Sequence, residues 1–164
     1  MISSIYKLSP PSTLDEWNAY HSIRRKVLFE NRGRFGVYKE DHPDEFKENH
    51  NPLLLFFNDE AIGTVRIDLV PERKMAILRL VAIKKDFQRK GHGEKLLALA
   101  EEFAMSKGCS MLALNAAIDA VPFYKKYGFE EMIWSQEERN DKSIQMTKVL
   151  SLLAIQIMKH KGTA

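Results

Sequence analysis

Six consecutive residues, Gln88-Arg89-Lys90-Gly91-His92-Gly93, have the composition of a loop that binds phosphate groups. They follow an apolar run with the pattern of a strand, residues 76–83, and precede a run with the pattern of a helix, residues 94–107. A glycine-containing turn before a helix leaves backbone N–H groups unpaired at the helix N-terminus, where the helix dipole adds partial positive charge. We therefore predict that residues 88–93 bind a diphosphate, with Lys95 adding to the charge of the loop.

Two familiar phosphate-binding loops do not match these residues. The pattern GxxxxGK[ST] requires a lysine after its last glycine, and Gly93 is followed by Glu94. The dinucleotide pattern GxGxxG requires a third glycine at position 96, where the chain has Leu96. An NAD(P)-binding protein is therefore disfavoured, and the pattern that remains is Q-R-K-G-H-G.

A second segment, Asp119–Phe129, identifies a family to which both segments are similar. The first loop resembles the Q/R-x-x-G-x-G/A signature with which the GNAT superfamily of N-acetyltransferases holds the pyrophosphate of acetyl-coenzyme A. The second resembles the A-x-x-F-Y-x-K-x-G-F segment of the same family, with matches at Ala120, Phe123, Tyr124, Lys126, Gly128 and Phe129. The resemblance extends over residues 62–149, and residues 1–50 fit it only in outline.

The resemblance implies an α/β (α+β) fold. We expect a mixed central sheet of about six to seven strands, with a β-bulge and a splay between its parallel pair, flanked by about four helices. Residues 1–150 are expected to form a single N-acetyltransferase domain. The apolar and then basic tail, residues 151–164, is expected to form a short packing helix, with a dimer contact as one role for it.

The same resemblance implies the reaction and its residues. It implies transfer of an acetyl group from acetyl-coenzyme A to a primary amine by direct attack, with Tyr124 as the general acid and Tyr127 as its alternative. The co-substrate acetyl-coenzyme A would bind to the backbone of residues 81–83 and of the 88–93 loop, and to two residues further along the chain. The expected coenzyme-binding residues are Val81, Ala82, Ile83, Gln88, Arg89, Lys90, Gly91, His92, Gly93, Asn115 and Tyr127. We expect the side chain of His92 to contact the coenzyme or to face solvent.

Two positions depart from the family pattern. Where many members carry an asparagine that orients coenzyme A, this chain has Ala117, and Asn115 is the expected substitute. Where many carry a glutamate or histidine as general base, it has Ile77, which cannot accept a proton. Three alternatives follow: the base is a residue elsewhere, a chain of water molecules carries the proton away, or the amine binds neutral and no base is needed. The candidate residues are Glu30, Asp41, His42 and Asp68.

Arg79 lies in the middle of an apolar strand and needs an anionic partner there. A structural pair with Asp68 or Glu131 is one interpretation. The other is an anchor for a carboxylate of the substrate. The acidic stretch of residues 40–48 would instead suit a cationic amine, although a solvated loop explains it as well.

Composition restricts the class of protein. The 164 residues are 45% hydrophobic, which is ordinary for a soluble domain. The net charge of +3, from 25 basic and 22 acidic side chains, argues against a nucleic-acid partner. The single cysteine, Cys109, indicates a reducing compartment, and we expect a cytoplasmic protein without a membrane span, a secretion signal or a metal. A monomer or a homodimer fits equally, and a non-catalytic coenzyme A-binding module is the alternative function.

Hydrophobic periodicity and turn residues predict the order of the elements. A capping box of Thr13 and Glu16 is expected to begin the first helix, which should end near residues 30–33. Gly108 is expected to end the second helix, in which Glu101 should face solvent, and Asp119 to cap the third. Strands are expected over residues 2–8, 53–57, 61–70, 74–83, 110–114, 129–134 and 143–149, and helices over residues 13–30, 44–48, 93–107 and 119–128.

Overall fold

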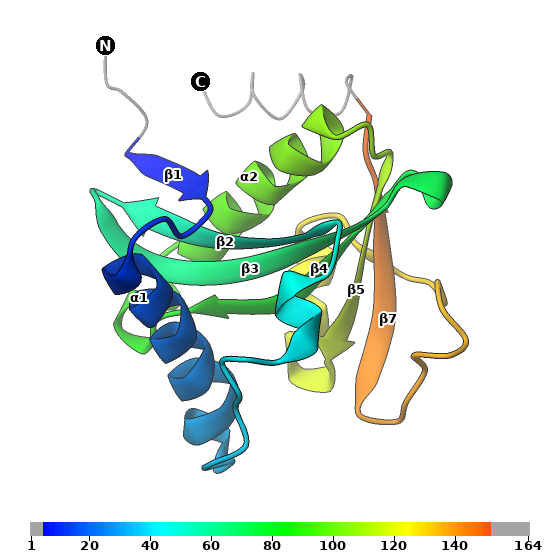
Figure 1. The fold of residues 1–164 in the computed structure, drawn as a ribbon. Helices are drawn as coiled ribbons and strands as arrows, with labels where there is room; N and C mark the ends of the chain where they lie inside the picture. The colour runs from blue at the N-terminus through cyan, green and yellow to red at the C-terminus, as the bar shows by residue number, and fades with distance from the viewer. Residues whose placement is uncertain (1–4, 152–164) are drawn as a thin grey trace. The chain divides into compact units, whose positions relative to one another are not determined.

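The computed structural model describes residues 5–151, which contain a seven-stranded mixed sheet and three α-helices (Figure 1). The strand order is β1-β2-β3-β4-β5-β7-β6, and β4 and β5 form its parallel pair. The strands are β1 Tyr6–Ser9, β2 His50–Phe57, β3 Glu60–Val70, β4 Met75–Ile83, β5 Met111–Ala117, β6 Glu130–Glu131 and β7 Ser143–Val149. The helices are α1 Leu14–Arg24, α2 His92–Ser106 and α3 Val121–Lys126. The expected tail helix lies outside the described residues.

The chain divides into two compact units. The first unit runs to Asp68 and resumes at Leu78–Glu102, and the second contains Leu69–Ile77 and the chain from Phe103 onward. Strands β3 and β4 therefore belong in part to each unit.

The first unit is an antiparallel meander packed against α1. In it β1 pairs with β2, and β2 pairs with β3. Tyr20 and Ile23 of α1 are buried with Leu54 of β2 and Ala82 of β4. Figure 1 shows α1 in front of this part of the sheet and α2 behind it. The positions of β2 and β3 follow the predicted strands, each lengthened at its N-terminal end.

The start of α1 confirms Thr13 as its N-cap, because the hydroxyl of Thr13 accepts the backbone N–H of Glu16 at 3.1 Å. The carboxylate of Glu16 accepts from Ser12 at 3.0 Å, one residue before the cap. Beyond Arg24 the helix widens into a π turn, Arg25–Phe29, and then tightens into a 3₁₀ turn, Glu30–Arg32. Gly33, at φ +77°, ends the segment where the sequence predicted its end.

The second unit packs β5, β7 and the short strand β6 around Trp134. Trp134 buries its ring with Met75, Ile77 and Ala113, and its indole N–H donates to the carbonyl of Leu114 at 2.9 Å. The predicted hairpin strand over residues 129–134 shortens to β6 because the backbone N–H of Trp134 donates instead to the side chain of Gln145 at 2.7 Å.

Two local expectations were wrong. Asp119 does not cap α3: it lies inside a 3₁₀ turn, Ile118–Ala120, and the N-cap residue is Ala120, which makes no side-chain cap. Glu101 of α2, expected to face solvent, is buried. The expected end of α2 at Gly108 is confirmed, since Gly108 adopts φ +84° and its N–H donates to the carbonyl of Met105 at 3.0 Å.

Candidate functional site

The strand that leads to the 88–93 loop is irregular at Leu80. This residue has φ +52°, a left-handed conformation that is unusual for leucine inside a strand, as expected at a bulge. Its carbonyl accepts a hydrogen bond from the Thr64 hydroxyl at 3.2 Å. A bulge at Leu80 would re-aim the backbone groups of Val81–Ile83, and it stays a prediction. The splay of the parallel pair stays a prediction.

The end of β4 is held close to β3. The N–H of Lys84 donates to the carbonyl of Ile62 at 2.8 Å. A Cβ atom added to Gly63 would lie 3.0 Å from the carbonyl oxygen of Ala82 and 2.8 Å from Cδ1 of Ile83. Glycine at this position therefore permits the close approach of the two strands at the residues expected to pair with the pantetheine arm.

The 88–93 loop is a turn with two left-handed residues, Arg89 at φ +61° and Gly91 at φ +87°. The side-chain amide of Gln88 donates to the carbonyl of Ile83 at 2.8 Å and ties the start of the loop to the strand. Helix α2 begins at His92, so the first N–H groups of the helix have no partner within it.

This loop fits a diphosphate. A Cβ atom added to Gly91 would meet nothing within 4 Å, so the space beside the backbone is open. Arg89, Lys90 and Lys95 are exposed beside it. Open backbone N–H groups at a helix N-terminus, surrounded by cations, form a donor set for phosphate oxygens.

His92 is the residue of this loop whose side chain turns inward. It is buried, its Nδ1 lies 2.8 Å from the hydroxyl of Tyr6, and its ring packs against Phe57 with 4.6 Å between centroids. The expectation of a solvent-facing side chain is therefore wrong. The imidazole is buried in the protein, away from the exposed surface of the loop. Its backbone N–H remains part of the loop. The partner Tyr6, in β1, is far away in the sequence and was not predicted.

In the second unit, Tyr124 is buried in α3, and burial raises the pKa of its phenol to about 12. Its ring packs edge-on against Phe123 and Phe129. Within residues 5–151 the hydroxyl takes part in no hydrogen bond to another side chain. The phenol is therefore protonated at neutral pH and keeps its proton available.

Two other predicted residues of the second unit have different surroundings. The amide nitrogen of Asn115 donates to Glu138 at 3.3 Å, whereas its Oδ1 is buried and finds no hydrogen-bond partner among the described residues. Such an orphaned acceptor fits an amide N–H of a ligand. Tyr127 is half-buried, with its ring 5.0 Å from that of Phe123. Ile77 is part of the hydrophobic core, as its side chain requires.

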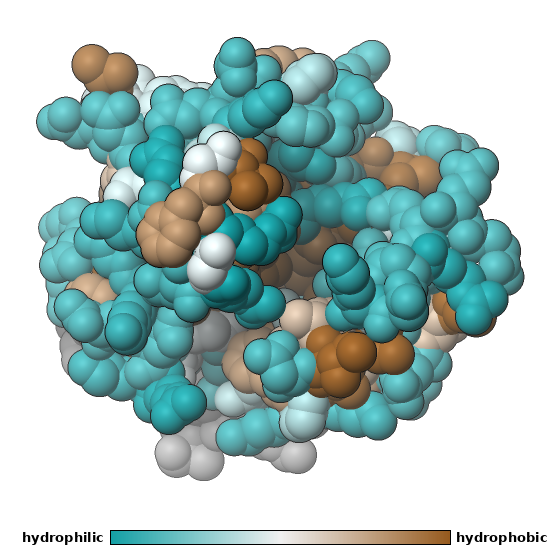
Figure 2. Space-filling model, turned by 90° about the horizontal axis from the view of Figure 1, so that it is seen from below, coloured by the Kyte–Doolittle hydropathy of each residue, from teal (hydrophilic) through white to brown (hydrophobic). Residues whose placement is uncertain are grey.

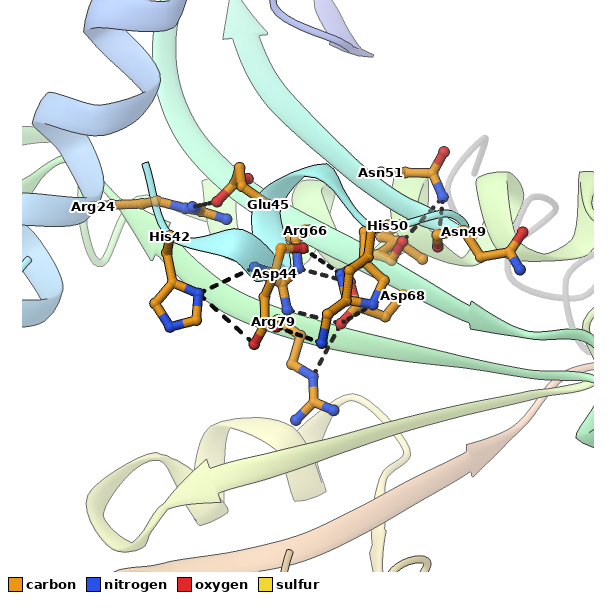
Figure 3. Close-up of polar contacts among 12 residues, drawn as sticks. Arg24, His42, Asp44, Glu45, Asn49, His50, Asn51, Arg66, Asp68 and Arg79 are labelled. Atoms are coloured by element: carbon orange, nitrogen blue, oxygen red, sulfur yellow. Dashed lines mark hydrogen bonds and ion pairs between the residues drawn. The ribbon is translucent and has the colours of Figure 1, made fainter. Parts of the chain in front are cut away.

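A polar network in the first unit surrounds Asp68 (Figure 3). Arg66 donates to both carboxylate oxygens, at 2.7 and 2.8 Å, and the Nε atom of Arg79 lies 3.3 Å from Oδ2. The Nε2 atom of His50 is 3.4 Å from Oδ2, and Nδ1 of the same ring contacts the carbonyl of Asp44. Arg79 thus has the structural partner Asp68 that the sequence analysis raised, and its contact with a substrate stays a prediction.

The acidic stretch is largely paired with basic residues. Glu45 is buried and accepts from Arg24 and from the hydroxyl of Tyr20, each at 2.5 Å. Glu40 accepts from Arg25, and Asp44 pairs with Lys47, whose hydrogen bond lowers the pKa of that carboxyl. These pairs give the loop a structural role and leave little unpaired negative charge for a cationic amine.

Two of the four candidate bases, Asp68 and His42, take part in hydrogen bonds with other residues. Asp68 is buried under two guanidinium groups, and His42 caps a 3₁₀ turn by accepting the N–H of Asp44 at 3.2 Å. Asp41 is exposed, and Glu30 is half-buried in the 3₁₀ turn after α1. A chain of water molecules and an amine that binds neutral stay the other predicted routes for the proton.

The described part of the chain contains neither a cluster of metal-ligating side chains nor a candidate membrane span. No group of three or more histidine, cysteine, aspartate or glutamate side chains in residues 5–151 is placed to hold a metal ion. No helix in the same range combines the length and the hydrophobicity that crossing a membrane requires. The face drawn in Figure 2 is mostly hydrophilic, with hydrophobic side chains in small patches.

Comparison with known proteins identifies the class to which this fold and these residues belong. The model of the acetyltransferase (GNAT) family matches residues 4–129. The chain belongs to this family, which uses acetyl-coenzyme A, and the protein is an acetyltransferase.

Individual relatives are distant. The uncharacterized protein YyaT of Bacillus subtilis is 29% identical over 131 residues, which cover 79% of this chain and 86% of that protein. The ribosomal-protein-S18-alanine N-acetyltransferase of Escherichia coli has a similar structure, with a TM-score of 0.68 and 20% identity. The match covers 90% of this chain and 95% of that enzyme. PaiA N-acetyltransferase of Thermoplasma acidophilum, in complex with coenzyme A, is also similar in structure, with a TM-score of 0.65 and 16% identity. The match covers 88% of this chain and 99% of that protein. At these identities the two structures establish the fold.

Proposed function

We propose that this protein transfers the acetyl group of acetyl-coenzyme A to a primary amine by direct attack within a ternary complex, with Tyr124 as the general acid. The observation that carries the proposal is the protonated phenol of Tyr124, buried in α3 and not engaged by another described side chain. A leaving thiolate needs a proton, and a phenol is protonated at neutral pH and can supply it. Burial raises the pKa of this phenol and makes it a weaker acid, so it keeps its proton until the thiolate forms.

The remaining residues have binding roles in this proposal. The backbone N–H groups of residues 88–93 hold the diphosphate, and the backbone of Val81–Ile83 pairs with the pantetheine arm. Asn115 accepts a hydrogen bond from the same arm through its orphaned oxygen. A backbone N–H near Val81 stabilises the oxyanion that forms when the amine adds to the thioester carbonyl.

The reaction balances with one proton given and one removed. A C–N bond forms, the C–S bond breaks, and Tyr124 donates its phenolic proton to the sulfur. After the C–N bond has formed, the nitrogen loses one proton through water, and one proton returns to the phenolate of Tyr124. An amine that binds neutral needs no base before the attack, and Ile77 occupies the usual place of that base. The acceptor is a small-molecule amine or an exposed amine of a protein. We place the protein in a reducing compartment, the cytoplasm, because its single cysteine cannot form an internal disulfide. A monomer or a homodimer is equally compatible with this proposal.

A non-catalytic coenzyme A-binding module is the second candidate. The specific observation in its favour is the buried Ile77 at the position of the base. Release of free thiol from acetyl-coenzyme A, measured with a panel of amines, separates the two functions. Turnover with any amine above the rate without enzyme excludes the non-catalytic module.

The Tyr124→Phe variant tests the general acid. It should fold, bind coenzyme A as the wild type does, and lose about 10²- to 10⁴-fold in kcat. In the wild type, the fall in rate that reports deprotonation of this acid should lie above pH 10, because burial raises the pKa of Tyr124 to about 12. An unchanged rate in Tyr124→Phe would transfer the role to Tyr127 or to water.

The Gly91→Val variant tests the diphosphate loop separately. Gly91 has φ +87°, which a β-branched residue rarely adopts, and valine would project into the open space beside the loop. Calorimetry should show at least tenfold weaker coenzyme A binding. Pantetheine, which lacks the diphosphate, should bind equally to both proteins, and equal binding of coenzyme A itself would make the assignment of the loop wrong.

A further inference from the structure

The 88–93 loop is anchored in the protein by one of its own side chains. His92 is 6% exposed, whereas Arg89, Lys90 and Gly91 directly before it are exposed. A buried imidazole in an exposed loop costs desolvation unless it is well packed and hydrogen-bonded, so this inward orientation requires a physical reason.

Three aromatic rings and one hydroxyl surround His92. The rings belong to Phe57 at 4.6 Å, Tyr6 at 5.7 Å and Phe87 at 5.7 Å between centroids. The hydroxyl of Tyr6 lies 2.8 Å from Nδ1 of His92, and the Tyr6 ring packs in turn on Phe57 at 5.0 Å. These residues come from β1, from the end of β2 and from the turn that follows β4, so the pocket is formed by three separate segments of the first unit.

The other end of the loop has its own anchor, the bond from Gln88 to the carbonyl of Ile83 at 2.8 Å. Between the two anchors the backbone is left-handed at Arg89 and at Gly91. Such conformations cost energy, above all for a residue with a Cβ atom, and persist where the surroundings impose them. Two fixed ends separated by three residues impose this conformation before any ligand binds.

We propose that His92 is a positioning residue for diphosphate binding, and that Tyr6 in β1 controls the affinity for coenzyme A through it. The inference rests on the proposed role of the loop in binding acetyl-coenzyme A. The N–H groups of Gly91, His92 and Gly93 are presented to the diphosphate because the imidazole is fixed, and the protein pays less entropy to order the loop on binding. The N-terminal strand is thereby part of the coenzyme site without touching the coenzyme.

The chain offers a matched control for the test. His21 and Tyr38 form a second buried-histidine pair, with 2.5 Å between Nδ1 and the hydroxyl, formed between α1 and the segment after it. Tyr6→Phe and Tyr38→Phe each remove one hydroxyl that contacts a buried imidazole. Only Tyr6→Phe should affect the loop.

Calorimetric titration with coenzyme A and with pantetheine gives the first readout. Tyr6→Phe should weaken coenzyme A binding about three- to tenfold, as expected from loss of one hydrogen bond. His92→Ala, which removes the whole anchor, should weaken it further. Pantetheine should bind equally to the wild type and all variants, and Tyr38→Phe should bind coenzyme A as the wild type does. In steady-state kinetics the KM for acetyl-coenzyme A should rise in Tyr6→Phe, with the KM for the amine unchanged.

Amide hydrogen exchange of residues 89–93 in the ligand-free protein gives a second readout, which does not depend on binding. Exchange should be faster in Tyr6→Phe than in Tyr38→Phe. Unchanged coenzyme A affinity and unchanged exchange in Tyr6→Phe would overturn the inference and leave the proposed function intact. Equal weakening of coenzyme A and pantetheine would also overturn it, because the effect would then be a general loss of structure. Failure of the wild type to bind coenzyme A would overturn the proposed function itself.

Discussion

Asp68 is the acceptor on which the polar network of the first unit depends. It receives two short hydrogen bonds from Arg66 and one longer contact from Arg79, and it is itself buried. A buried carboxylate that loses its cation is costly, so the two arginines should contribute to stability in proportion to their geometry.

The two arginines can be distinguished by substitution. Arg66→Leu should lower the free energy of unfolding by about 3–5 kcal/mol, because it removes a bidentate partner inside the protein. Arg79→Leu should cost only about 1 kcal/mol, because Asp68 keeps Arg66 and the Arg79 side chain is 25% exposed. Urea unfolding measures both values.

The same two variants also test whether Arg79 binds substrate. A rise in KM for acceptors that carry a carboxylate, limited to Arg79→Leu, would support an additional contact with the acceptor. An unfolding cost for Arg79→Leu as large as that for Arg66→Leu would contradict the assignment of Arg66 as the main partner.

At the scale of elements, the proposed coenzyme-binding segment of the first unit depends on how closely β3 approaches the end of β4. Gly63 lies at this approach, and the carbonyl of Ala82 would be 3.0 Å from any Cβ atom placed there. The side chain of Ile83 can rotate away, whereas the Ala82 carbonyl can move only with its strand. A methyl group at Gly63 must therefore displace the backbone of β4 at Ala82.

Gly63→Ala should lower stability by about 1–3 kcal/mol, as overpacking does in other cores. It should also weaken coenzyme A binding, because the displaced backbone is the segment proposed to pair with pantetheine. Gly36→Ala is the control: its φ of +71° makes alanine strained, yet its Cβ atom would meet nothing within 4 Å. Thermal unfolding and calorimetry of both variants should show reduced stability in each and reduced affinity only in Gly63→Ala. Unaltered affinity in Gly63→Ala would separate the β3–β4 contact from coenzyme binding.

At the scale of the whole molecule, the buried imidazole of His21 couples stability to pH. His21 is buried in α1, and burial lowers the pKa of its imidazole, with Arg24 and Arg25 acting in the same direction and Glu40 and Glu45 against it. A lowered pKa means that the folded protein binds this proton less readily than the unfolded chain. The contribution to stability is therefore complete above the unfolded pKa of about 6.5 and is lost as the pH falls below it.

Unfolding experiments at pH 7.5, 6.5 and 5.5 should show this loss in the wild type. A His21→Asn variant should be less stable at pH 7.5, since it loses packing, but its stability should fall less between pH 7.5 and 5.5. Taking the difference between the two proteins cancels the contribution of groups that both contain. Parallel pH dependences would show that His21 is not the group responsible.

The sequence alone determined the features whose physical causes are local. Gly108 was predicted to end the second helix and Gly91 to lie in the turn before it. Both predictions hold, and both glycines have left-handed backbone, because the need for a glycine is a property of one residue. The Thr13 cap and the bounds of α2 follow from residues within one or two turns. The match of two short motifs was sufficient to identify the family.

Only the tertiary structure decided which side chains meet across long separations. Tyr6 and His92 are 86 residues apart, and the sequence contains no periodic signal that joins them. His50 lies beside Asp68 because β2 and β3 pair in a register that places the two residues opposite each other. The capping role expected of Asp119 failed because the preceding chain continues into a 3₁₀ turn, which moves the start of α3 beyond it. Contacts of this kind depend on strand register and on the packing of distant segments, and local propensity does not encode either.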